Sequence, residues 1–169
     1  MPDLAPFHGA IVFVHVLGVF LFLLAHGVSA AVLLRLRSER NPHAVRTLVD
    51  LSARSISVMG VGAAMWLFTG IAAGFSGNYW TDGRLWIWAS VVVAIAVVAV
   101  MTPMGRLYLN RVRLAVGIDP RGNSDQPLPA EVDPAALEAA IASGRPLLLA
   151  AIGLGGVAIL TWLMMFKPF

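Results

Sequence analysis

The chain has no cysteine and few charged residues. Of its 169 residues, 12% are charged and 59% are hydrophobic, whereas soluble domains carry about 25% charged residues. Without cysteine, a disulfide, a thiolate metal site and thiol catalysis are excluded, and cysteine usage says nothing about the compartment. The scarcity of charge excludes an ordinary soluble domain and predicts a protein whose solvent is lipid.

The motifs of common enzymes and pumps are also missing. The sequence contains no glycine-rich phosphate loop, no His-Glu-x-x-His and no nucleophile elbow, so we assign no catalytic residue. Its apolar runs hold no Asp or Glu, which pumps and coupled transporters usually place within their spans. A hydrolase and a proton pump are therefore disfavoured. The basic residues are dispersed among acids, which favours anionic lipid over nucleic acid as their partner.

Four apolar runs are long enough to cross a bilayer, which takes about 20 helical residues. They predict an all-α transmembrane bundle of four helices that forms a single domain over residues 1–169. The expected spans are residues 8–34, 55–76, 85–105 and 146–166. Pro103 and Arg106 end the third run, and a cytosolic loop with one short helix is expected over 106–145. The first run lacks a basic segment before it and is too long for a signal peptide, so we interpret it as a span.

The distribution of basic residues predicts the orientation. Ten of the twelve Lys and Arg residues follow the first and third runs, and only Arg84 and Lys167 lie on the opposite side. By the positive-inside rule, both termini are outside a multi-pass protein of the inner (plasma) membrane. Four tryptophans then fall near the outer interface, as in an aromatic belt: Trp80, Trp86, Trp88 and Trp162.

Capping signals place two helix starts in the cytosol. Asn41 followed by Pro42 predicts a helix that begins well before the second span. Asp133 followed by Pro134 predicts a short surface helix that stops at Gly144. Between these signals, residues 117–132 are rich in Pro, Gly, Asn and Asp and are expected to form a flexible loop.

Small residues recur at the four-residue spacing that lets membrane helices approach closely. The pairs are Gly27 with Ala31, Gly60 with Ala64 and Gly70 with Gly74, besides the group Gly153, Gly155 and Gly156. Such residues serve either packing within one bundle or the interface of a homodimer. The segment from Gly70 to Gly74 is the best candidate for a dimer interface.

Three of the four histidines, His8, His15 and His26, lie in the first apolar run. On a helix their spacing brings all three to within about 20° of one line. Ionisable side chains in a span usually face protein or water, so this stripe is the candidate functional site. We expect His8 at the outer interface and the other two within the membrane. One interpretation is structural, with each imidazole in a hydrogen bond to a hydroxyl of another span, at Ser57, Thr69, Ser90 or Thr161.

The other interpretation is that His15 and His26 bind a cofactor, either haem b or a soft metal such as copper. No other span has a histidine, so a second ligand within one protomer would be methionine or water. Counted from the outer ends of the spans, His26 is level with Met59, Met101 and Met104, and these four residues form the candidate metal site. Methionine is also the ordinary gap-filler of apolar cores, so packing is the favoured interpretation of this alignment.

Three segments carry a resemblance to a known family. They are Phe13-Val14-His15-Val16-Leu17-Gly18-Val19-Phe20, Leu24-Ala25-His26-Gly27-Val28-Ser29 and Trp162-Leu163-Met164-Met165-Phe166-Lys167-Pro168. With these, nearly the whole chain resembles an uncharacterised bacterial family of four-span integral membrane proteins, distantly similar to CopD-like and cytochrome b-like bundles. The resemblance implies a fold and a membrane location. That family has no established activity, so the resemblance implies no catalytic residue.

The sequence leaves three functions open. The first is a small membrane protein that binds haem b or a soft metal through His15 and His26, in a redox or cofactor-handling role. The second is a non-catalytic scaffold or accessory subunit that assembles as a homodimer or with a larger membrane complex. The third is a transporter of a neutral or lipidic solute.

Overall fold

The computed structural model describes residues 4–81, 84–119 and 134–169. The elements are a short 3-10 helix η1 (Ala5–Phe7) and the helices α1 (His8–Leu36), α2 (Pro42–Ser76), α3 (Leu85–Ala115), α4 (Pro134–Ile141) and α5 (Arg145–Phe166). No strand occurs among these residues. Four helical segments are long and apolar enough to cross a membrane: Ala5–Leu36, Pro42–Ser76, Leu85–Ala115 and Pro134–Phe166. The prediction of an all-α transmembrane bundle in a multi-pass membrane protein is confirmed.

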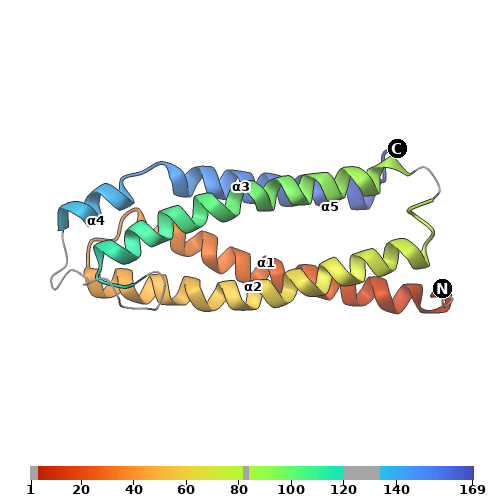
Figure 1. Ribbon diagram of the computed structural model, residues 1–169, viewed down its shortest axis with the longest axis horizontal. Helices are drawn as coiled ribbons and strands as arrows, with labels where there is room; N and C mark the ends of the chain where they lie inside the picture. The colour runs from red at the N-terminus through yellow and green to blue at the C-terminus, as the bar shows by residue number, and fades with distance from the viewer. Residues whose placement is uncertain (1–3, 82–83, 120–133) are drawn as a thin grey trace.

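The four long helices form two antiparallel pairs (Figure 1). Helix α1 packs along most of its length against α2, and α3 packs against α5, whereas contacts between the two pairs are few. Both chain ends lie at one end of the bundle, and α4 lies at the other end (Figure 1). The bundle therefore consists of two hairpins, α1/α2 and α3/α5, that share a limited interface.

Glycines that the sequence did not single out set the close approach of α1 to α2. A Cβ at Gly62 would lie 2.6 Å from the backbone nitrogen of Phe22, and a Cβ at Gly18 would lie 2.7 Å from that of Trp66. Further along the same interface, the hydroxyls of Ser29 and Ser55 are 2.8 Å apart in a hydrogen bond. The two backbones touch because neither glycine has a side chain, as in small-residue interfaces of membrane helices generally.

A compact apolar core forms at the end of the bundle that carries α4. It joins α1, α2, α3 and α4 through these buried residues: Val32, Leu36, Val45, Val49, Tyr108, Leu109, Val112, Ala115, Val116, Leu137, Ala140 and Ile141.

Helix α2 begins at Pro42, and the Asn41 side chain accepts hydrogen bonds from the amides of His43 and Ala44, so the predicted cap is confirmed.

Two predicted boundaries were wrong. Helix α3 does not end near Pro103 but continues to Ala115, so the segment from Arg106 to Ala115 is helix and not part of a loop. A proline within a membrane helix is tolerated where neighbouring groups compensate for the missing amide, and the residues beyond it are held by the core. Helix α4 was predicted correctly from Pro134, but it ends at Ile141, and Gly144 is the N-cap of α5 instead of a stop signal. Most of the predicted flexible loop, 120–132, lies outside the described residues.

The predicted small-residue faces divide into filled and open positions. Gly70 lies against His15 and Gly74 against Trp80, so the segment proposed for a dimer interface is occupied within one chain. Gly27, Gly60 and Gly155 have no heavy atom within 4 Å of the position that a Cβ would take. Packing inside the bundle thus explains the Gly70–Gly74 pair.

Candidate functional site

Each of the three histidines of α1 lies over a glycine of another element. The imidazole carbon Cε1 of His8 faces Gly77, that of His15 faces Gly70, and Nε2 of His26 faces Gly153. The absent side chain of each glycine provides the space that the ring occupies. The histidines therefore share one stripe on α1 but have three different surroundings.

His8 has hydrogen-bond partners for both ring nitrogens. Its Nδ1 lies 2.8 Å from the hydroxyl of Ser76, and its Nε2 lies 3.4 Å from that of Tyr79. The Tyr79 ring also meets the imidazole edge-on, with centroids 5.8 Å apart. These contacts connect the start of α1 to the end of α2 and leave neither nitrogen for a ligand.

His15 connects α1 to the middle of α2. Its Nδ1 lies 2.8 Å from the carbonyl oxygen of Trp66, and because a carbonyl only accepts, Nδ1 is the donor. The Thr69 hydroxyl is 3.5 Å from the same nitrogen, but it donates to the Met65 carbonyl at 2.6 Å. The structural interpretation named Thr69 as one possible partner, and Trp66 is the closer one. In the neutral tautomer that this bond selects, Nε2 keeps its lone pair.

His26 is different because no hydrogen bond joins it to any of the described residues. Its ring stacks on Phe22, one turn earlier, with centroids 5.6 Å apart and planes 6° from parallel. Its Nε2 lies 2.7 Å from the position that a Cβ on Gly153 would have, and the Met101 methyl carbon lies 3.2 Å from the same point. An imidazole from α1 and a thioether from α3 thus meet at a glycine of α5.

For the other two candidate methionines, Met59 and Met104, no contact with His26 is observed among the described residues. Met104 follows Met101 by three residues on α3, a spacing that makes two side chains neighbours on a helix surface. Met59 lies one turn from Ser55 and one turn from Gly62 on α2, which places it opposite the segment of α1 just before His26. Among the three candidate methionines, proximity to His26 is thus observed for Met101, and the depth match of the other two stays a prediction.

The histidines do not form a joint site. At 1.5 Å per residue, His15 and His26 are about 16 Å apart along α1, too far for one metal ion. Within residues 4–81, 84–119 and 134–169, no group of three or more His, Asp or Glu side chains is placed to hold a metal.

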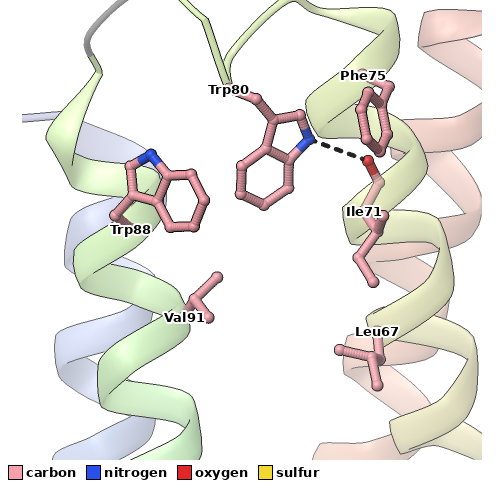
Figure 2. Close-up of a pocket in the computed structure, with 6 residues that line it drawn as sticks. All are labelled: Leu67, Ile71, Phe75, Trp80, Trp88 and Val91. Atoms are coloured by element: carbon pink, nitrogen blue, oxygen red, sulfur yellow. Dashed lines mark hydrogen bonds between the residues drawn. The ribbon is translucent and has the colours of Figure 1, made fainter.

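The bundle also contains a cleft that the sequence did not predict. It lies between α2 and α3, has a volume of about 430 Å³, and is lined by Leu67, Ile71, Phe75, Trp80, Trp88 and Val91. Figure 2 shows the two tryptophans together at one end of the cleft, with Leu67 and Val91 further along it. The available signal was the pair Trp80 and Trp88, which we interpreted only as part of an interfacial belt.

The sequence also missed two groups around His26. Phe22 precedes it by four residues, a spacing that stacks side chains on one helix face, so this contact was predictable. The role of Gly153 was not, because it depends on how α5 packs against α1.

Comparisons of the chain with protein-family models, with curated proteins and with solved structures gave no match. The family resemblance therefore stays a prediction, and no residue role comes from a relative.

Proposed function

We propose that this multi-pass membrane protein binds a soft metal ion, Cu(I), between His26 and Met101, in a redox or cofactor-handling role. The observation that carries the proposal is the meeting of the imidazole nitrogen and the thioether methyl group at Gly153, each within 3.3 Å of one point. These groups come from helices α1 and α3, so a bound ion would connect the two hairpins.

The chemistry of the two side chains favours copper over a hard cation. Thioether ligands are soft and select Cu(I), and imidazole suits copper as well, whereas Mg²⁺ and Ca²⁺ require carboxylate or carbonyl oxygens. None of the described residues forms a hydrogen bond with His26, so no hydrogen bond from these residues competes with a ligand for its ring nitrogens. Met104, one turn from Met101, supplies a further thioether within reach of a small side-chain rearrangement.

Haem b fits the arrangement less well. Nε2 of His26 lies 2.7 Å from the Cβ position on Gly153, so α5 occupies the side of the ring on which a porphyrin would have to sit. Haem binding would require the α3/α5 hairpin to move away from α1. A single ion requires no such space, and for this reason we commit to copper and keep haem as a measurable alternative.

The test is copper binding by the purified protein under reducing conditions, measured by elemental analysis together with a visible spectrum. We expect about one copper per chain, and loss of most of it in His26→Ala and in Met101→Leu, which retains the side-chain size. His15→Ala is the control and should keep the copper, because His15 contacts the Trp66 carbonyl instead. A wild-type protein that retains no copper, or a His26→Ala variant that retains it fully, would refute the proposal. If the purified protein instead shows a haem spectrum that disappears only in the histidine variants, the bound cofactor is haem and not copper.

An accessory-subunit function has one observation in its favour. Gly27 on α1 and Gly60 on α2 are both exposed and have open space where a side chain would lie. Open glycines allow close approach of a further helix. Crosslinking in native membranes tests this second candidate function. We expect a discrete crosslinked adduct in the wild type and its loss when Gly60 is replaced by a bulky residue.

A further inference from the structure

We infer that the cleft between α2 and α3 binds one acyl chain of a phospholipid from the leaflet on the side of the chain termini. This inference is independent of the copper site, because the cleft and His26 lie on different faces and at different depths of the bundle. It depends on the chemistry of the cleft lining, on the depth of the cleft and on the residues at its mouth.

The lining offers nothing to a polar ligand. All six side chains are aliphatic or aromatic, and the Trp80 indole N–H is directed at the Ile71 carbonyl oxygen at 3.4 Å. Water or a polar solute in the cleft would lose hydrogen bonds without replacement, which is costly inside a membrane. The volume of about 430 Å³ is in the range of sites for small apolar ligands, about 300–1,000 Å³.

The depth of the cleft corresponds to one leaflet. From Phe75 to Leu67 the cleft follows α2 for about 12 Å at 1.5 Å per residue, and half of a hydrocarbon core of about 30 Å is about 15 Å. The tryptophans mark the shallow end, where indole rings prefer to lie. A lipid chain that enters at the tryptophans would thus extend to about the middle of the bilayer.

The cleft exists because of a glycine and an aromatic cluster. The Trp80 indole lies directly on Gly74, where a Cβ would overlap the ring nitrogen, and it packs against Trp88 with centroids 5.1 Å apart. The ring pair therefore bridges the two hairpins only at the mouth, and the deeper part between Ile71 and Val91 remains unfilled (Figure 2).

A cation at the same end complements a phosphate group. The Lys167 ammonium lies over the rings of Tyr79 and Trp86, with centroid distances of 5.4 and 5.5 Å. Tyr79 immediately precedes Trp80 in the chain, so this charge lies at the same end of the bundle as the cleft mouth. The combination of an apolar slot one leaflet deep and a cation at the interface matches the two parts of a phospholipid.

The test is lipid retention measured by native mass spectrometry of the detergent-purified protein titrated with dioleoyl phosphatidylethanolamine. We expect a one-lipid adduct that survives for the wild type and is lost in Val91→Trp, which fills the cleft. Val92→Trp is the matched control, since Val92 is 65% exposed on the adjacent face of α3, and it should retain the adduct. If Val91→Trp fails to fold, Ile71→Trp fills the cleft from the opposite wall.

Three results would overturn the inference. One is a wild-type protein without a one-lipid adduct, and another is equal retention in the cleft variant and the control. The third is a wild-type dimer that Val91→Trp converts to a monomer, because the occupant would then be a second copy of the chain.

Discussion

At the scale of single residues, the surroundings of the three histidines depend on the glycine beneath each ring and on the hydrogen bonds available nearby. His8 and His15 have partners on α2 and connect two helices, whereas His26 has a stacking aromatic ring, a glycine and a thioether. The same side chain on one helix thus connects two helices at two positions, and at the third it is the proposed ligand of a metal ion.

Gly153 can be tested without changing His26 itself. In Gly153→Ala the new methyl group would lie 2.7 Å from Nε2 of His26, so we expect the ring to be displaced and copper binding to fall. Because the neighbours at this position are side-chain ends that can move, we expect a smaller loss of stability than the roughly 1–3 kcal/mol of overpacking against a rigid backbone. Gly155→Ala is the matched control because nothing lies within 4 Å of its Cβ position. Copper content and thermal unfolding of both variants check the prediction, which fails if the two behave alike.

Glu39 gives a prediction on pH. The backbone N–H of Asn41 donates to its carboxylate, and this bond, with Arg35 nearby, holds the pKa of Glu39 below its ordinary value of 4.5. A lowered carboxylate pKa stabilises the fold above the unfolded-state pKa, and that stabilisation is lost as the pH falls through the folded-state value. Thermal unfolding at a series of pH values should therefore show a small loss on acidification that Glu39→Gln removes. A loss of the same size in the variant would assign the effect to other groups.

At the scale of helices, the α1/α2 hairpin is a closer association than the contact between the hairpins. Its interface consists of Gly18 and Gly62 at backbone contact and the Ser29–Ser55 hydrogen bond. Between the hairpins, the spanning segments leave the cleft lined by apolar side chains. We infer that α1/α2 is the more rigid of the two associations.

The α1/α2 interface predicts a contrast between two glycines of one helix. In Gly62→Ala the added methyl group would lie 2.6 Å from the Phe22 backbone nitrogen, and a backbone cannot rotate away as a side chain can. We expect a loss of roughly 1–3 kcal/mol. Gly60→Ala has open space and should be neutral or stabilising, since alanine favours a helix over glycine. Unfolding in detergent measures both, and equal stability of the two variants would contradict the packing.

At the scale of the whole molecule, the end that carries α4 joins the hairpins. Arg40, between α1 and α2, pairs with Glu138 of α4 at 2.5 Å, and the Arg46 side chain donates to the Val116 carbonyl at 2.8 Å. The buried core lies at the same end. The opposite end carries the termini, the aromatic cluster and the mouth of the cleft, so the two ends differ both in chemistry and in packing.

The lack of cysteine in the natural sequence makes the orientation simple to test. Thr81 is exposed at the end with the termini, and Ser38 is exposed at the end with α4. If basic residues face the cytosol, a membrane-impermeant maleimide should label Thr81→Cys in intact cells and Ser38→Cys only after lysis. The reverse pattern would invert the topology and place the cleft in the cytosolic leaflet.

Local patterns in the sequence were enough to predict the four helices, the histidine stripe and the Asn41 cap. Each depends on the hydropathy of one run, on helical spacing or on a capping residue, and all of these are properties of neighbouring residues. The extension of α3 past Pro103 was not predictable in this way, because the core that holds its last turns comes from three other helices.

Tertiary structure alone decided which helix faces which. Helix α1 is apolar on all sides, so its periodicity does not say which face contacts α2 and which faces α5. The match of each histidine with a glycine, the proximity of Met101 to His26 and the α2/α3 cleft all depend on that choice. The sequence by itself thus determined a four-span membrane protein with histidines on one line, and the packing of the two hairpins decided that the His26 ring and the Met101 methyl group come together at Gly153.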